Sequence, residues 1–433
     1  MGIILNKRGL LNARTAIFRV DAGPGIGMGH FMRCRTLACE MIARGWVVFF
    51  IGHGLPVCCA KNSHNGVVGN INFIETDFFQ NSRDDVINLL DILQKRFGWN
   101  LDCLIVDTYR YSRDDFAFLQ RFSVHRLAVV VIDDLANRDT PAQAVINPNP
   151  MFSSEPYDRQ HIPVVLCGEK YTLVRPEIVS LAGRVYDNSG PLMISLGGGD
   201  VVRPMMKLLT AIPEGFKRRI CVSVSPDCPL QEIESWIARD PVQRFLNTDI
   251  DKFPELLASS SLAITGGGTT LWEVYCLGMP SLGLIWVDNQ KHTSVIIKEQ
   301  ATSFMVDLVT QINFELNSEW LDSGLKSLSK QLGSHNAVRS MQEEAFLAGS
   351  LIKKEKTSLV AESVDMINSD FIALILAKLD EEPDFWQNMI ERQHGLIDGQ
   401  GARRCVEILE TLAWREVTLF EADWRRIYEN WQV

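Results

Sequence analysis

The sequence predicts an α/β protein of two lobes, each built on a parallel sheet with helices on both faces. Between residues 16 and 296, short apolar runs alternate with helix-compatible segments. Residues 127–132 form a continuous apolar run, as expected of a strand buried on both faces. The order of strand, glycine-rich loop and helix occurs in both halves, with a proline- and polar-rich interval between them.

The composition bounds the class of function. A chain of 433 residues with 46% hydrophobic and 22% charged residues can form two cores. The net charge of −10 and the scattered Lys and Arg residues argue against a nucleic-acid binder. The expected ligand is therefore a small molecule.

The cysteines and the apolar runs indicate the compartment. The ten cysteines lie on apolar faces, singly in loops or, for Cys58 and Cys59, next to each other, without paired zinc-ligand spacing. We therefore expect reduced thiols and a cytoplasmic protein without a metal. The N-terminus lacks the apolar core of a signal peptide, and no run is long enough to span a membrane. We expect no membrane insertion.

The first lobe begins with a strand at 16–21 and the loop GPGIGMGH at 23–30. A helix at 31–42 and a strand at 47–51 follow. The loop glycines do not follow the G-x-G-x-x-G dinucleotide pattern, and no acidic residue closes the second strand. This disfavours nicotinamide binding.

His30 begins the helix at the carboxyl edge of the first strand, where open α/β sheets bind ligands. A helix N-terminus favours the neutral form of an imidazole, which can accept a proton. His30 could instead only cap the helix. The surrounding glycines favour the catalytic interpretation.

The rest of this lobe continues the alternation of strands and helices and carries polar residues at strand ends. Asp107, Tyr109, Asp133 and Asp134 should share the edge of His30. Adjacent Asp133 and Asp134 should point opposite ways, which favours a turn over a paired-carboxylate site. Tyr109 could orient a substrate or simply pack its ring. The predicted elements are a strand at 71–74, a helix at 84–97, a strand at 101–107, a helix from Ser112 and a strand at 127–132.

The second lobe has a strand at 192–196 and, later, the stretch LAITGGGTTLWEVYCLGMPSLGLIWVDNQ at 262–290. Its three glycines between a strand and a helix could be an ordinary turn or a seat for a diphosphate. Thr269 or Thr270 could cap the helix or bind a phosphate oxygen. Glu273, placed to bind ribose hydroxyls, favours the diphosphate site.

The predicted division of the chain has five parts. We expect helices at 371–379, 386–393 and 402–412 near the C-terminus. The parts are a first lobe at 1–165, a second lobe at 166–313, a helical insertion at 314–368, C-terminal helices completing the second lobe at 369–413, and a tail at 414–433.

Several motifs together resemble the UDP-sugar hydrolase family of pseudaminic acid biosynthesis. The resemblance covers roughly residues 18–300 and 395–412 and implies a GT-B glycosyltransferase-like fold, with a cleft between two Rossmann-like lobes. The motifs are RVDAGPGIGMGHFMRC (19–34), LIVDTYRYS (104–112), VIDDLANR (131–138), YTLVRPE (171–177), ISLGGGD (194–200), TGGGTTLWEVYCLGMPSL (265–282), VDNQ (287–290) and LIDGQGARR (396–404).

The resemblance also implies roles for residues. The family hydrolyses UDP-2,4-diacetamido-2,4,6-trideoxy-β-L-altropyranose at the anomeric C–O bond with inversion, without a metal or other cofactor. It implies the catalytic-site residues His30, Tyr109 and Asn289. The implied UDP-sugar contacts are Gly27, Gly29, Arg33, Gly198, Gly199, Gly267, Gly268, Thr269, Thr270, Glu273 and Gln290.

Two alternatives and three departures accompany this resemblance. A sugar transferase of the same fold would share these residues, and a non-catalytic nucleotide-sugar binding protein would fit the long insertion. Gly199 stands where the family often has serine, and the insertion at 314–368 has no counterpart. The tail from Trp414 resembles the start of a GNAT-type acetyltransferase.

Overall fold

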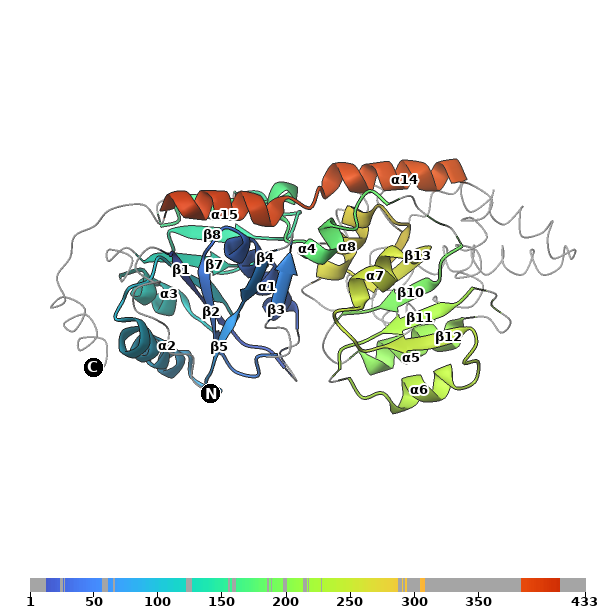
Figure 1. Ribbon diagram of the computed structural model, residues 1–433, viewed down its shortest axis with the longest axis horizontal. Coiled ribbons are helices and arrows are strands. Elements are labelled where there is room, and N and C mark those ends of the chain that lie inside the picture. The colour runs from blue at the N-terminus through green and yellow to red at the C-terminus, as the bar shows by residue number, and fades with distance from the viewer. Residues whose placement is uncertain are drawn as a thin grey trace, which may run out of the picture. The chain divides into compact units, whose positions relative to one another are not determined.

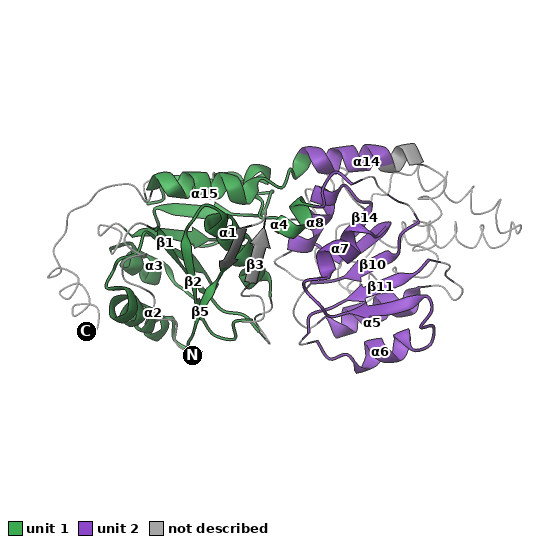
Figure 2. Cartoon of the chain, viewed as in Figure 1, with its two compact units in different colours: residues 1–180, 396–433 green, residues 181–395 purple. Residues whose placement is uncertain are grey.

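The computed structural model of the chain forms two compact units (Figures 1 and 2). Unit 1 comprises residues 1–180 and 396–433, and unit 2 comprises residues 181–395. The structure describes residues 13–307 and 383–412, except for 24–25, 27, 57–60, 65–66, 122–126, 155, 158–160, 185–186, 188, 198–200, 213–215, 217, 227, 287–289, 291–292 and 294–303. The predicted insertion at 314–368, the predicted helix at 371–379 and the tail lie outside these residues.

Unit 1 contains a parallel sheet of seven strands in the order β5-β2-β1-β6-β7-β8-β9. The predicted strands are all present, whereas β8 and β9 were not predicted, because they are short and lie next to irregular, proline-containing segments. The strands are β1 (Thr15–Val20), β2 (Val47–Gly52), β5 (Asn72–Glu75), β6 (Cys103–Asp107), β7 (Ala128–Ile132), β8 (Ala144–Asn147) and β9 (Val164–Cys167), with the antiparallel pair β3 (Lys61–His64) and β4 (Val67–Asn70) apart from them.

The helices of unit 1 cover both faces of this sheet. On one face, α2 and α3 pack in a single apolar core with alternate strand residues such as Ile17 and Leu104. Ser112 begins α3 as predicted, because its side chain and Asp115 form a capping box. The helices are α1 (Gly29–Ala43), α2 (Ser82–Ile92), η2 (Leu93–Phe97), α3 (Arg113–Gln120), η4 (Glu169–Tyr171), α4 (Pro176–Val179) and α15 (Gly401–Leu412).

Helix α15 belongs to unit 1, although the sequence assigned residues 369–413 to the second lobe. A Cβ on Gly401 would lie 2.1 Å from the carbonyl oxygen of Thr172, so the glycine lets the start of α15 sit directly on the η4 segment. Arg44, the residue that follows α1, also pairs with Glu410 of α15 at 3.2 Å. The motifs YTLVRPE and LIDGQGARR, far apart in sequence, therefore meet in unit 1. The division falls after residue 180 rather than after 165, because η4 and α4 pack with this unit.

Unit 2 contains a six-stranded parallel sheet in the order β12-β11-β10-β13-β14-β15. Its main core joins alternate strand residues to α5, α6 and Met389 of α14. The elements are β10 (Leu192–Ser195), α5 (Val202–Ala211), β11 (Ile220–Ser223), α6 (Gln231–Ile237), β12 (Arg244–Asn247), α7 (Phe253–Ala258), β13 (Leu262–Gly266), α8 (Thr269–Leu277), β14 (Ser281–Ile285), β15 (Phe304–Asp307) and α14 (Pro383–Leu396).

Both sheets reverse their strand order at one point. In unit 1 the first strand β1 lies between β2 and β6, and in unit 2 β10 lies between β11 and β13. Connections leave toward opposite sides at such a point, which opens a crevice at the carboxyl ends of the strands. The loops after β1 and β6, and those after β10 and β13, therefore mark where each unit should bind ligands.

Within the described part of the chain, no helix combines the length and apolar character needed to cross a bilayer.

Candidate active site

His30 lies at the reversal point of the unit 1 sheet. It is the second residue of α1, and the loop that precedes this helix leaves the carboxyl end of β1. Its side chain is 12% exposed. A Cβ on the neighbouring Gly29 would meet nothing within 4 Å, so the space beside the helix start is open. The structure places His30 at the carboxyl edge of the first strand, as predicted, and its catalytic role stays a prediction.

Asp107, the last residue of β6, holds the His30 ring. Its Oδ1 atom lies 2.6 Å from Nδ1 of His30. Nη2 of Arg33, which can only donate, lies 2.9 Å from the same Nδ1, but it donates at the shorter distance of 2.6 Å to Oδ1 of Asp107. Since a carboxylate can only accept, the shorter contact of Nδ1 with Asp107 favours the tautomer that carries the proton on Nδ1. Nε2 then carries the lone pair and can accept a proton.

Arg33, one helical turn after His30, fixes Asp107 in turn. Its Nε donates to Oδ2 of Asp107 and its Nη2 to Oδ1, both at 2.6 Å. Burial alone would raise the pKa of Asp107, but the guanidinium of Arg33 and the His30 ring outweigh it and hold the pKa well below its usual range. Asp107 therefore stays ionised.

Arg33 joins a second carboxylate, that of Asp134, to this group. Arg33 also donates through Nη1 to Oδ2 of Asp134 at 2.5 Å. Two carboxylates facing one guanidinium leave one net negative charge. This net charge lies beside the His30 ring, whose Nδ1 is 2.6 Å from Asp107.

Tyr109 completes the group. Its ring packs edge-on against the His30 ring, with centroids 4.5 Å apart, and its hydroxyl donates to the Asp134 carboxylate at 2.9 Å. Burial and the Asp134 charge raise the pKa of Tyr109 well above its usual range, so the phenol stays protonated. The ring both packs and remains 43% exposed, so it can also contact a ligand.

The sequence placed these groups at one edge but did not assign roles to Asp107 and Asp134. The adjacent carboxylates do point apart: Asp134 faces Arg33, whereas Asp133 faces the hydroxyl of Tyr157 at 3.2 Å. Asp134 is nevertheless part of the site, so the turn interpretation was incomplete. The sequence offered one sign of this cluster. Residues three apart on a helix share a face, so Arg33 could be expected beside His30, together with the carboxylates that a buried arginine needs.

Arg33 was expected to contact UDP. Its guanidinium instead binds Asp107 and Asp134, and its side chain is only 5% exposed. The observed contacts make it a positioning residue for Asp107, and a direct contact with UDP stays a prediction.

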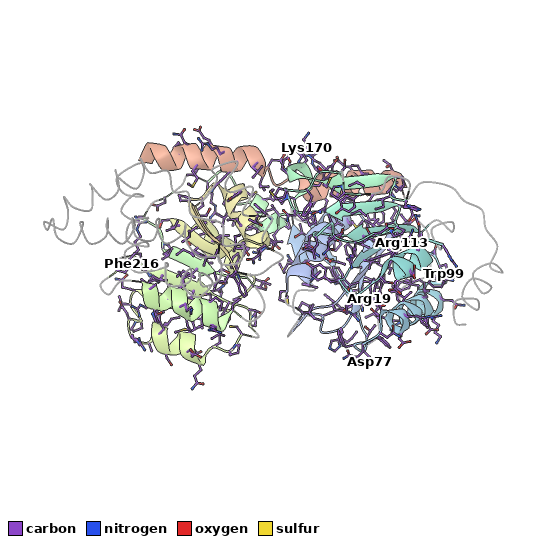
Figure 3. The ribbon with its side chains drawn as sticks, turned by 180° about the vertical axis from the view of Figure 1, so that it is seen from behind. Arg19, Asp77, Trp99, Arg113, Lys170 and Phe216 are labelled. Carbon is purple, nitrogen blue, oxygen red and sulfur yellow. The ribbon has the colours of Figure 1, made fainter. Side chains whose placement is uncertain are left out.

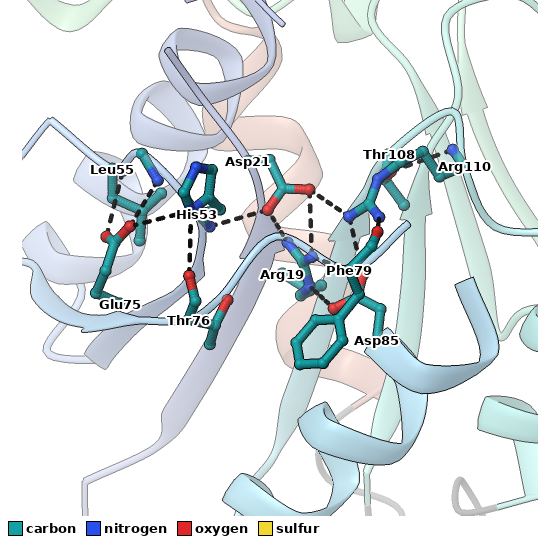
Figure 4. A network of polar contacts seen from close by, with 11 residues as sticks. Arg19, Asp21, His53, Leu55, Glu75, Thr76, Phe79, Asp85, Thr108 and Arg110 are labelled. Atoms are coloured by element: carbon teal, nitrogen blue, oxygen red, sulfur yellow. Dashed lines mark hydrogen bonds and ion pairs between the residues drawn. The ribbon is translucent and has the colours of Figure 1, made fainter. Parts of the chain in front are cut away.

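A second charge cluster, which the sequence did not reveal, ties together the loops around His30 (Figure 4). Arg19, buried inside unit 1 (Figure 3), donates to Asp21 and Asp85 at 2.6 Å each. Arg110, after β6, donates to the same two carboxylates at 2.6 and 3.0 Å. Asp21 also accepts the backbone N–H of His53 at 2.9 Å. The ends of β1, β2 and β6 are thus cross-linked next to the glycine-rich loop.

In unit 2, helix α8 presents its N-terminus at the reversal point beside β13. Gly268 is the N-cap residue, and no side chain caps the helix. Thr269 and Thr270 therefore do not cap α8, which leaves the phosphate-binding alternative for their hydroxyls. An uncapped helix start with its backbone N–H groups suits an anion.

The three glycines before α8 differ in the space around their Cα atoms. A Cβ on Gly266 would lie 2.7 Å from the Leu196 carbonyl oxygen, and one on Gly267 would lie 2.3 Å from Cδ1 of Ile285. The N–H of Gly267 already donates to the Leu284 carbonyl at 2.9 Å. These two glycines serve packing. Gly268 alone of the three has open space, so ligand approach should occur there and at the following amides.

The remaining predicted residues divide into two sets. Glu273 is buried in α8, and Gln290 accepts the backbone N–H of Trp286 at 3.2 Å with its amide nitrogen near Gly266 and Gly268. Their contacts to UDP stay predictions. Four predicted residues lie outside the described part of the chain: Gly27, Gly198, Gly199 and Asn289.

Among the residues that the structure describes, no three His, Cys, Asp or Glu side chains gather as a metal-binding group. Independence from metals and other cofactors stays a prediction.

Comparison with curated proteins finds one sequence relative. No protein-family model matches the chain. The spore coat polysaccharide biosynthesis protein SpsG of Bacillus subtilis (strain 168) is 26% identical over 154 residues, which are 35% of this chain. The match spans only 45% of the length of that protein.

Comparison with solved structures concerns the fold. The chain is similar to the glycotransferase of kitacinnamycin (TM-score 0.54, 10% identity, 92% of this chain and 99% of that one). It is similar to Staphylococcus aureus MnaA, solved with UDP (TM-score 0.52, 10% identity, 94% and 100%). It is also similar to the spinosyn rhamnosyltransferase SpnG (TM-score 0.50, 14% identity, 91% and 100%). With its two parallel sheets, the chain therefore has the predicted GT-B glycosyltransferase-like fold.

Proposed function

We propose that this chain hydrolyses a UDP-linked 2,4-diacetamido-2,4,6-trideoxy sugar, releasing UDP and the free sugar for nonulosonic (pseudaminic) acid biosynthesis. The observation that carries the proposal is the hydrogen bond between Nδ1 of His30 and the buried, arginine-clamped Asp107 at 2.6 Å. It leaves Nε2 as a proton acceptor at the ligand edge of unit 1. The sequence motifs supply the choice of sugar.

In this mechanism, Nε2 of His30 takes a proton from a water molecule as the water oxygen attacks the anomeric carbon. The bond from that carbon to the phosphate oxygen breaks, and UDP leaves with the electron pair. The first amides of α8 would stabilise its charge. Attack opposite the leaving group inverts the anomeric centre. General-base catalysis of this kind contributes on the order of a hundredfold or more in rate.

The first test replaces His30 by Asn or Phe. UDP release should be abolished, while UDP affinity, measured by titration calorimetry, should stay within about twofold, because most of the proposed UDP contacts lie in unit 2 and His30 is proposed to act on the attacking water. Near-normal turnover in either variant would contradict the proposed base. Turnover that survives EDTA treatment would agree with a metal-independent reaction.

A glycosyltransferase is the second candidate, because two of the structures with similar folds are described as transferring sugars. His30 would then take the proton of an acceptor hydroxyl instead of water. Incubation of the protein with the UDP-sugar alone, followed by NMR, separates the two activities. Free sugar and UDP appearing without an acceptor indicate hydrolysis, and an unchanged UDP-sugar that reacts only after an acceptor is added indicates transfer.

A further inference from the structure

Two exposed rings mark the carboxyl edge of the unit 1 sheet. Phe78 is 40% exposed and Tyr109 is 43% exposed, and they are the exposed large hydrophobic side chains among the described residues of this unit. Phe78 follows β5, and Tyr109 follows β6. Both rings therefore lie at the edge where the loops of an open α/β sheet bind ligands.

Phe78 is held in place by charged and polar neighbours. The guanidinium of Arg110 lies 4.8 Å from the centroid of the Phe78 ring, and the His53 ring packs edge-on against it at 5.7 Å. Arg110 also donates to the carbonyl oxygen of Phe79 at 2.5 Å and to Asp21 at 2.6 Å. The ring is therefore fixed at the surface from two sides.

Phe78 lies at the same sheet edge as the candidate active site, because both follow the carboxyl ends of strands of the unit 1 sheet. Arg110, which contacts Phe78, directly follows Tyr109 in the chain, and the Tyr109 ring packs on His30 at 4.5 Å. The consecutive residues Tyr109 and Arg110 thus contact His30 and Phe78, respectively. All four belong to unit 1, and all follow strands at the same sheet edge.

We propose that Phe78 determines sugar specificity by contacting the methyl groups of the substrate. This inference rests on the proposed function. The 2,4-diacetamido-2,4,6-trideoxy sugar carries two acetamido methyls and the C6 methyl, whereas N-acetylglucosamine carries one acetamido methyl and hydroxyls at C4 and C6. Methyl and ring C–H groups pack favourably on the electron-rich face of an aromatic ring, and hydroxyls gain less there.

The test measures binding by titration calorimetry in the His30→Asn background, which keeps the ligand intact. The probes are UDP, UDP-N-acetylglucosamine and the UDP-diacetamido sugar. Phe78→Ala should weaken binding of the UDP-diacetamido sugar about five- to tenfold, the size of one aromatic contact. It should leave UDP unchanged and weaken UDP-N-acetylglucosamine by about twofold or less, and Phe78→Tyr should restore affinity.

Val242→Ala is the matched control, because it removes an apolar side chain that is 77% exposed in unit 2. Its affinities should equal those of the parent. The inference is overturned if Phe78→Ala changes no affinity, if it weakens UDP equally, or if the parent binds the UDP-diacetamido sugar no more tightly than UDP. If the selective loss is found but the wild-type chain shows no hydrolysis, the sugar contact stands and the proposed hydrolysis fails.

Discussion

Asp107→Asn tests the proposed role of the carboxylate most directly. Oδ1 of Asp107 accepts from Nδ1 of His30 at 2.6 Å. An asparagine has the same shape but can turn its NH2 group toward Nδ1, which would then have to accept. The imidazole proton would move to Nε2, the nitrogen that should remove the proton from water.

The expected loss of activity follows from that tautomer change. Removing a correctly oriented general base costs about 10²–10⁴-fold in kcat. The substitution also leaves the buried Arg33 with one carboxylate instead of two, which we expect to cost about 3 kcal/mol in the free energy of unfolding. For a unit of this size, that lowers Tm by about 6–12 °C.

Two measurements distinguish a loss of activity caused by the changed His30 tautomer from one caused by lower stability. Long-range ¹H–¹⁵N NMR of His30 should show the proton on Nδ1 in the parent and on Nε2 in Asp107→Asn, at a temperature where both are folded. Glu177→Gln is the matched control. This change neutralises a carboxylate that pairs at 2.7 Å with Arg35, a buried arginine of α1, the helix that also carries His30 and Arg33. Within the described structure, Glu177 makes no hydrogen bond or ion pair with His30.

Glu177→Gln should lower Tm and leave both the His30 tautomer and the rate of UDP release per folded molecule unchanged. An Asp107→Asn variant with the parent tautomer and near-normal turnover would refute the assignment of Nε2 as the base. A control that lost activity as strongly as Asp107→Asn would show that loss of stability explains the effect.

Three further outcomes are expected. Gly267→Ala should destabilise unit 2 in urea denaturation, because its Cβ would lie 2.3 Å from Cδ1 of Ile285. Gly268→Ala should fold normally but weaken UDP binding in calorimetry. The reverse pattern would contradict a packing role for Gly267 and a ligand-binding role for Gly268. Tyr109→Phe should change Tm little, since one partly exposed hydrogen bond is worth about 1 kcal/mol. If the Tyr109 hydroxyl orients the substrate, the variant should release UDP about tenfold more slowly. Unchanged kinetics would indicate that the Tyr109 ring only packs. The pKa of Asp107 is held below its ordinary value of 3.8, so the ionised carboxylate stabilises the folded state above that pH, and this stabilisation is lost as the pH falls below it. Acid titration followed by circular dichroism should therefore show a shallower loss of folded protein in Asp107→Asn than in the parent. Parallel curves would count against the ion pair of Asp107 with Arg33.

Local patterns predicted much of the fold because they depend on near neighbours. The apolar run before Asp133, the helical spacing after His30 and the cap at Ser112 each specify an element from a few adjacent residues. The strands β8 and β9 were not predicted, because a run of only four residues beside prolines resembles a loop. Placing α15 on unit 1 required knowing that Gly401 meets Thr172, a contact across more than two hundred residues of chain.

For the site, the sequence by itself determined which residues end the strands and begin the helices, and so placed His30, Tyr109 and the glycines at ligand edges. The tertiary structure alone decided which of these groups meet. Asp107 reaches His30 because β6 lies beside β1 in the sheet, and strand order is set by long-range packing that no local pattern encodes. The same holds for Gly267, where the close approach of Ile285 on the neighbouring strand already favours glycine and only the tertiary structure reveals it.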